Sequence, residues 1–174
     1  MSKYTTRFEK FHNFTMLNEG YVSDDPKDLG GLTICGVSSV YHPIWFAKLW
    51  KARSNKALFN SLLEDFYYQN FYNPLYEEIQ DEQLAFRLYD LGVNLGVKTA
   101  VKFLQIAHNR LFINPRIAVD GVYGTGTSLA ICMHPHLDKI YEEYIEVVAA
   151  HYRTRKTAKT HLNGWLNRLN KRLP

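Results

Sequence analysis

The first third of the chain begins with an amphipathic pattern over residues 6–19. Thr6 and Glu9 have the spacing of a capping box, and Gly20 suits the left-handed position just past a helix end. Four large apolar side chains recur about once per helical turn between these signals: Phe8, Phe11, Phe14 and Leu17. The pattern predicts a buried first helix that ends at Glu19.

A polar stretch rich in turn residues follows this helix. Pro26 and the Gly30-Gly31 pair interrupt regular structure there, as in a short irregular hairpin. Three carboxylates lie in the same stretch: Asp24, Asp25 and Asp28. We therefore expect Glu19, at the last turn of the helix, to face a polar loop. Residues 34–40 are either a short strand or the lead into the next helix.

Helical periodicity continues through the rest of the chain. Ser61 and Glu64 have the spacing of a second capping box. The helix that they open must stop before Pro74, because the residue before a proline avoids helical geometry. A leucine stripe predicts another helix over residues 81–95. Further helices are expected in three places: after Pro43, over 98–108 and over 135–157. The sequence predicts a mainly α fold with a small irregular β-hairpin after the first helix.

Aromatic side chains are frequent, with twelve Tyr, ten Phe and three Trp among 174 residues. Core packing accounts for most of them, because a chain of this length that is 46% hydrophobic forms the core of one or two small domains. The alternative is that some of them line a groove and stack on the flat apolar faces of sugar rings.

The net charge of +4 is unevenly distributed. Residues 64–90 contain seven acidic side chains and one basic side chain, Arg87. No acid follows Glu146, whereas seven cations do: Arg153, Arg155, Lys156, Lys159, Arg168, Lys171 and Arg172. This basic tail suits an anionic partner such as a cell-wall polymer or a membrane surface, or is simply a solvated helix face. No nucleic-acid-binding fingerprint is present, so we expect no nucleic-acid partner.

Metal, disulfide and cofactor chemistry find little support in the sequence. Cys35 and Cys132 stand among apolar residues and are expected to be buried thiols. The His134-Pro135-His136 segment lacks a third ligand at helical spacing and is interpreted as a helix start. There is no glycine-rich phosphate loop. We therefore expect neither a metal site nor a cofactor.

Targeting signals are also missing from the sequence. The N-terminus has no positively charged start followed by an apolar run, as a signal peptide would have. No apolar stretch reaches the length of about 18 residues that is typical of a membrane-spanning helix. We expect no transmembrane segment, and synthesis in the cytoplasm.

Four separated segments carry a family resemblance. Residues 19–33 read E-G-Y-V-S-D-D-P-K-D-L-G-G-L-T, close to a pattern E-G-G-Y-V-x-D-P-x-D-x-G-G-x-T that lacks one glycine here. Residues 70–75, 90–96 and 161–168 are similar to the motifs Y-W-x-P-L, F-D-x-A-V-N-S-G and G-W-x-x-R. Together these segments resemble glycoside hydrolase family 108, which consists of lysozyme-like N-acetylmuramidases. The order Glu19, Asp28, Thr33 also resembles the catalytic triad of tailed-phage lysozymes.

The resemblance implies a role for each of these residues. Glu19 would be the general acid, and both the helix dipole and apolar neighbours would raise its pKa as that role requires. Asp28 would position the water or stabilise the oxocarbenium ion, and Thr33 would help to orient that water. Four further side chains are expected to contact substrate: Tyr21, Tyr72, Asp90 and Asn94. For Tyr72, a structural role beside Pro74 is the alternative. For Asp90 and Asn94, the alternatives are a helix cap and a surface contact.

The resemblance also implies a function. We expect a peptidoglycan hydrolase that cleaves the β-1,4 bond between N-acetylmuramic acid and N-acetylglucosamine. It would act as a monomeric phage endolysin that a separate membrane pore releases. The alternatives are an inactive peptidoglycan-binding protein, a wall protein of a phage tail or secretion machine, and a lytic transglycosylase.

The resemblance divides the chain into two regions. Residues 1–95 would form the catalytic region, and residues 96–174 a peptidoglycan-binding-like region packed on it. The alternative is one continuous domain. The V-D-G-x-Y-G segment at 119–124 is similar to peptidoglycan-binding modules. We interpret it first as turn architecture, in which Thr125 or Thr127 caps the next helix.

Overall fold

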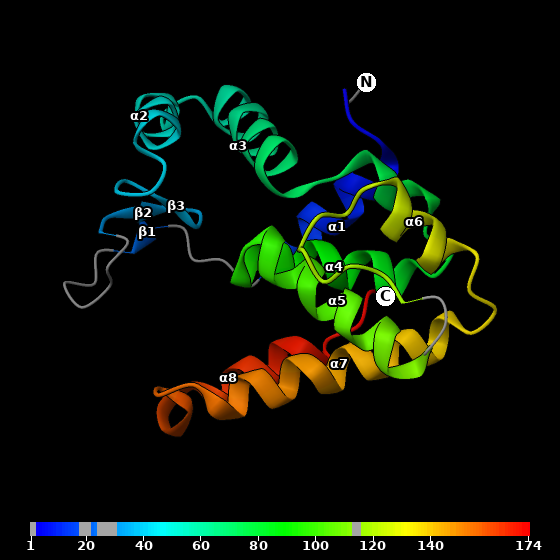
Figure 1. Cartoon of the computed structure of the whole chain (residues 1–174). Coiled ribbons are helices and arrows are strands. Elements are labelled where there is room, and N and C mark those ends of the chain that lie inside the picture. Colours follow the sequence, from blue (N-terminus) through cyan, green and yellow to red (C-terminus); the bar gives the residue numbers. More distant parts are fainter. Residues whose placement is uncertain (1–2, 18–21, 24–30, 113–115) are drawn as a thin grey trace. The chain divides into compact units, whose positions relative to one another are not determined.

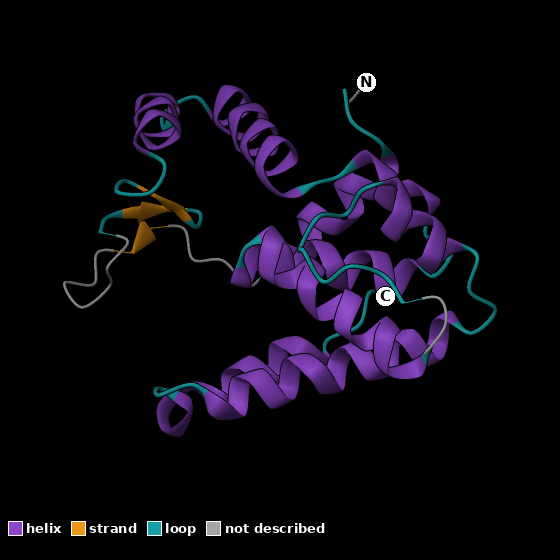
Figure 2. Ribbon diagram, in the orientation of Figure 1, coloured by secondary structure: helices purple, strands orange, loops and turns teal. Residues whose placement is uncertain are grey.

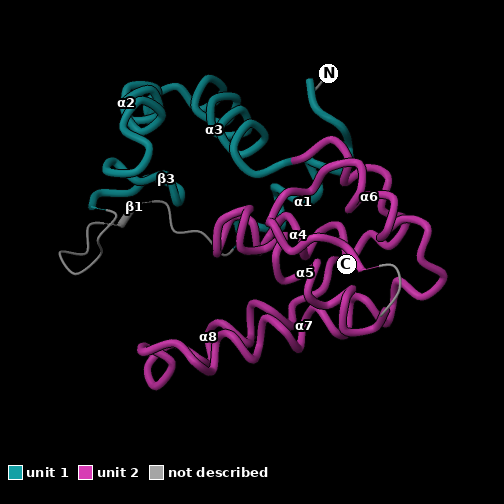
Figure 3. Tube along the Cα trace, in the orientation of Figure 1, with its two compact units in different colours: residues 1–72 teal, residues 73–174 magenta. Residues whose placement is uncertain are grey.

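The computed structural model describes residues 3–17, 22–23, 31–112 and 116–174 (Figure 1). They form a mainly α fold with a small antiparallel sheet after the first helix, which confirms the predicted fold class (Figure 2). The chain divides into two compact units, Met1–Tyr72 and Asn73–Pro174 (Figure 3). The division expected from the sequence, between residues 95 and 96, falls inside the second unit.

The first helix, α1, spans Thr6–Met16 and is shorter than predicted. Thr5 rather than Thr6 is the N-cap, and its side-chain oxygen accepts a hydrogen bond from the Phe8 amide (3.2 Å). The helix ends at Met16, and Leu17, the last member of the apolar stripe, is its C-cap and is 77% exposed. The expectation of a helix that reaches Glu19 is therefore wrong.

Three two-residue strands follow: β1 (Val22–Ser23), β2 (Thr33–Ile34) and β3 (Val37–Ser38). They pair in the antiparallel order β1-β2-β3, with Ser23 and Ser38 opposite Thr33. Cys35 and Gly36, between β2 and β3, have φ of 45° and 75°. Positive φ at both central residues is typical of a type I′ hairpin turn. The Tyr67 hydroxyl donates to the Cys35 carbonyl (2.9 Å) and connects this turn to the helix that contains Tyr67.

Two helices complete the first unit: α2 (Pro43–Ala52) and α3 (Lys56–Phe71). Asn55 caps α3 by accepting from the Leu58 amide (3.1 Å), so this helix starts before the predicted Ser61. It ends before Pro74, as predicted. Most of the aromatic side chains in this unit pack against one another, which confirms core packing as their main role. Those with the least exposure are Phe8, Phe11, Phe66 and Tyr67.

The second unit begins with a 3₁₀ helix, η1 (Pro74–Glu78). Its helices are α4 (Glu82–Leu95), α5 (Val97–Leu111), α6 (Thr125–Cys132), α7 (Leu137–Thr154) and α8 (Ala158–Asn170). Helix α5 packs between α4 and α7, and α8 packs on α7. Gly96, at φ 86°, makes the tight connection between α4 and α5. His136 lies at the start of α7, as the helix-start interpretation predicted.

The V-D-G-x-Y-G segment is built around the buried Gln105 of α5. The Gln105 amide nitrogen donates to Asp120 Oδ1 (2.9 Å) and Thr127 Oγ1 (3.1 Å), and its Oε1 accepts from the Gly121 amide (2.9 Å). Neither predicted threonine caps α6, because Gly124 occupies the N-cap and Thr127 faces inward. The segment is therefore turn architecture, as interpreted first. Within the described ranges, no helix is long and apolar enough to cross a membrane.

His12 is a buried base in α1. Its ring lies 5.5 Å from the Phe8 ring and 5.0 Å from the Tyr67 ring. Its Nδ1 has no hydrogen-bond partner among the described residues. Burial lowers the pKa of His12 to about 4.

We predict that His12 makes the protein less stable in acid. Between its unfolded pKa of about 6.5 and its folded pKa of about 4, only the unfolded state binds the proton. Stability should therefore fall as pH drops through this window, by about 3 kcal/mol in total. Urea denaturation at pH 7 and pH 4.5 measures the loss. His12→Phe should lose less stability than wild type between these pH values, and equal losses would contradict the assignment.

Candidate active site

Three of the predicted site residues, Glu19, Tyr21 and Asp28, lie outside the described residues. Their roles as general acid, substrate contact and second catalytic group stay predictions. The other four, Thr33, Tyr72, Asp90 and Asn94, are described.

Thr33 lies in the middle strand of the small sheet. Its neighbour Ile34 is buried in the core. Because successive side chains of a strand point to opposite faces, Thr33 points to the other face, where it is half-buried. Ser23 and Ser38 lie opposite it on the flanking strands. A hydroxyl in this position is fixed by the sheet rather than by a loose loop, as a water-orienting group requires.

Tyr72 ends α3 and is buried. Its ring lies edge-on to Phe8 at 5.2 Å between centroids and stacks on Tyr68 at 5.3 Å. These contacts connect the end of α3 to α1. The packing favours the structural alternative for this tyrosine, and its contact with substrate stays a prediction.

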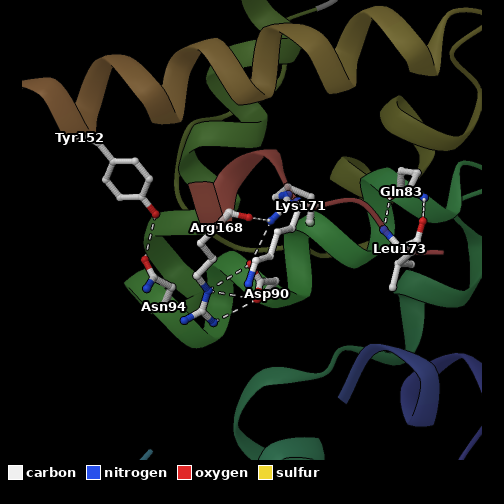
Figure 4. Close-up of polar contacts among 8 residues, drawn as sticks. Gln83, Asp90, Asn94, Tyr152, Arg168, Lys171 and Leu173 are labelled. Atoms are coloured by element: carbon white, nitrogen blue, oxygen red, sulfur yellow. Dashed lines mark hydrogen bonds and ion pairs between the residues drawn. The ribbon is translucent and has the colours of Figure 1, made fainter. Parts of the chain in front are cut away.

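Asp90 lies at the centre of a buried ion-pair network (Figure 4). Its side chain is 1% exposed. Arg87 Nη1, one turn earlier in α4, donates to Asp90 Oδ2 at 3.0 Å. Arg168 Nη2, from α8, donates to Asp90 Oδ1 at 3.0 Å. The Asp90 carboxylate therefore pairs with two guanidinium groups. Its contact with Arg168 joins two segments of the family resemblance, residues 90–96 and residues 161–168.

The Arg87 guanidinium also holds the end of the chain. It donates to the backbone carbonyls of Arg168 (3.1 Å) and Lys171. One turn earlier in α4, the Gln83 side chain pairs with the backbone of Leu173 (Figure 4). Gln83 Nε2 donates to the Leu173 carbonyl (3.1 Å), and Gln83 Oε1 accepts from the Leu173 amide (3.0 Å). One face of α4 thus fixes α8 and the C-terminal residues.

Asn94 lies one turn after Asp90 and is exposed. Its Oδ1 accepts a hydrogen bond from the Tyr152 hydroxyl of α7 (2.9 Å) (Figure 4). Burial raises the pKa of Tyr152 to about 12, so this hydroxyl remains a donor at neutral pH. Asp90 and Asn94 therefore hold α4 against α8 and α7. Their contact with substrate stays a prediction, and for Asp90 it would require the ion pairs to open.

The sequence did not indicate that Arg87 and Arg168 share one carboxylate. One signal was present, since Arg87 is the only cation among the seven acids of residues 64–90. A second missed feature lies in the first unit, where Glu64 of α3 has a raised pKa. Desolvation is the main cause, and the carboxylates of Glu9 and Asp65 add to it.

The described residues include no metal-binding cluster. Across residues 3–17, 22–23, 31–112 and 116–174, no three His, Cys, Asp or Glu side chains are grouped to hold a metal ion. Glycosidic bond cleavage by two carboxyl groups requires no metal.

We predict that Asp90→Asn strongly destabilises the second unit. The substitution leaves the Arg87 guanidinium buried without an anion, at a cost of about 3–5 kcal/mol. Urea denaturation followed by circular dichroism measures the change. Arg110→Gln is the control, because the Arg110–Glu143 pair (2.9 Å) is solvent-exposed and should contribute less than about 1 kcal/mol. Similar stabilities of the two variants would contradict a central role for the Asp90 network.

The comparisons with known proteins agree with this fold. The solved structure of Brucella abortus SagA matches with a TM-score of 0.71 and 24% identity, over 93% of this chain and 88% of that one. This likeness shows a shared fold. No curated protein matches the chain significantly. The family model for glycosyl hydrolase 108 matches residues 12–96, which contain all seven predicted site residues. Residues 12–96 thus belong to glycosyl hydrolase family 108, and the protein is a lysozyme-like glycoside hydrolase.

Proposed function

We propose that the protein hydrolyses peptidoglycan at the β-1,4 bond between N-acetylmuramic acid and N-acetylglucosamine. The observation that carries this proposal is the family match over residues 12–96. That segment contains Glu19, Asp28 and Thr33, whose order resembles the catalytic triad of tailed-phage lysozymes. The peptidoglycan substrate follows from the family, and the individual bond is our proposal.

In this mechanism, Glu19 protonates the glycosidic oxygen as the bond to the leaving sugar breaks. Asp28 stabilises the positive charge that develops on the sugar ring, or holds the attacking water. Thr33 orients that water from the polar face of β2. The water proton then passes to a carboxylate, so that proton donation and proton uptake balance over one turnover.

We also propose that the protein is a phage endolysin that acts as a monomer. It would be made in the host cytoplasm and reach the wall through a separate membrane pore. The support is the likeness of the Glu19, Asp28 and Thr33 order to tailed-phage lysozymes. A bacterial protein of prophage origin would carry out the same chemistry.

We predict that Glu19→Gln keeps the fold and lowers turnover by a factor on the order of 10² or more, because the general acid is lost. Purified peptidoglycan is digested, and the reduced products are read by mass spectrometry. Reducible muramic acid ends from wild type identify a muramidase. Glu77→Gln, which neutralises an exposed carboxylate of η1, is the matched control and should retain activity.

Three results would contradict the assignment. Full activity of Glu19→Gln would show that Glu19 is not the general acid. Anhydro-muramic ends would indicate a lytic transglycosylase. Wall binding without any products would indicate a binding protein. Thermal melting of each variant confirms that it is folded before activities are compared.

We predict that expression in a bacterial cytoplasm lyses cells only when a pore-forming membrane protein is co-expressed. The physical reason is that a folded enzyme does not cross the lipid bilayer unaided. Culture turbidity is the readout, and Glu19→Gln with the pore protein is the control that should not lyse beyond the pore alone. Rapid lysis without the pore protein would contradict release through a pore.

A further inference from the structure

The outer side of α2 combines exposed apolar and basic side chains. Ile44, Lys48 and Lys51 follow one another at helical spacing on the exposed side of this helix. Tyr41, in the turn before α2, and Ile44 are 64% and 72% exposed, and Trp50 is 36% exposed. We call Tyr41, Ile44, Lys48, Trp50 and Lys51 the α2 face.

The opposite side of α2 is buried within the first unit. Leu49 and Ala52 point inward and are buried. The helix packs against α3 and against strands β2 and β3. The exposed side chains of α2 therefore project from a helix that is packed against the rest of the first unit.

Among the described residues, no carboxylate pairs with the cations of this region. Residues 31–63, which include β2, β3, α2 and the first half of α3, contain no Asp or Glu. They carry four exposed cations: Lys48, Lys51, Arg53 and Lys56. None of these four forms an ion pair with a described carboxylate. The first acids in α3, Glu64 and Asp65, face Lys3, Tyr4 and Glu9 instead.

Two of these cations stack on indole rings. Lys48 Nζ lies 4.7 Å from the centre of the Trp45 ring, and the Arg53 guanidinium lies 4.8 Å from that of Trp50. Trp50 also stacks on Phe46, at 5.6 Å between centroids. Tryptophan and tyrosine are enriched at the level of lipid headgroups, because their rings have an apolar body and a polar edge.

We propose that the α2 face docks on the surface of an anionic lipid membrane. Exposed apolar side chains together with unpaired cations are the combination that interfacial helices use, since burial of apolar area and attraction to anionic headgroups add to each other. The charge complementarity favours an anionic surface, and the exposed Ile44 and Tyr41 favour a surface with an apolar layer beneath its charges. Docking would hold the enzyme beside the membrane that borders the peptidoglycan.

Sedimentation with lipid vesicles tests the proposal without depending on cleavage. Wild type should sediment with phosphatidylglycerol-containing vesicles and stay in solution with pure phosphatidylcholine. High salt should reduce the binding, because it screens the attraction between the cations and the headgroups. The double variant Lys48→Gln with Lys51→Gln should bind the anionic vesicles about tenfold more weakly or worse. Ile44→Ser should also weaken binding.

Matched controls separate the α2 face from the rest of the surface. Lys156→Gln with Lys159→Gln removes the same charge from exposed positions of the second unit, and Met133→Ser removes an exposed apolar side chain there. Both controls should bind like wild type. Bromine-labelled lipid should quench tryptophan fluorescence in wild type, and less so in Trp50→Leu.

Three results would overturn the proposal. The first is no binding to anionic vesicles. The second is equal loss in the Lys156, Lys159 variant, which would assign binding to the basic tail. The third is unchanged vesicle binding with weaker binding to isolated peptidoglycan in the α2 variants, which would make the face a glycan contact. Peptidoglycan cleavage by wild type is measured separately, so a failure of the membrane proposal differs from a failure of the hydrolase proposal.

Discussion

The buried carboxylate of Asp90 is the interaction on which the second unit depends. A charge in this position is costly to remove from water, and the two guanidinium groups of Arg87 and Arg168 offset that cost. Arg87 also binds backbone carbonyls in the last turn of α8 and just after it, so the ion pair and the chain end are fixed by the same side chain. A single carboxylate therefore connects α4, α8 and the C-terminal segment.

This connection extends beyond the part of the chain that carries the family match. Asp90 and Asn94 lie within residues 12–96, but their partners Arg168 and Tyr152 do not. The matched segment alone contains Asp90 and Arg87 but lacks Arg168, so one of the two guanidinium groups that pair with Asp90 would be missing. The division into the units Met1–Tyr72 and Asn73–Pro174 also places α4 with later parts of the chain, because α4 packs against α5 and α7. The family segment and the compact units are therefore different divisions of the chain.

The two halves of α3 differ in their electrostatics. Around Glu64, three carboxylates lie near one another, with Lys3 as a neighbouring cation. Before Glu64, the chain back to residue 31 carries only positive charge. Burial of carboxylates raises pKa values, whereas exposed cations attract anionic surfaces. The first unit thus has clustered carboxylates at one place and a basic, partly apolar surface at another, and the proposed membrane docking concerns only the second.

The sequence by itself determined the helical class, the hairpin after the first helix and the family, because periodicity, turn residues and motif order are local properties. It predicted the end of α3 at Pro74, since proline restricts its own neighbour. It misjudged the end of α1 and the caps of α3 and α6. At α6 the reason is tertiary, because Thr127 faces inward and bonds to Gln105 instead of capping the helix. Only the tertiary structure decided the contacts of Asp90, Asn94 and Gln105. Their partners are distant in sequence, and no local pattern records which distant group meets a buried polar atom.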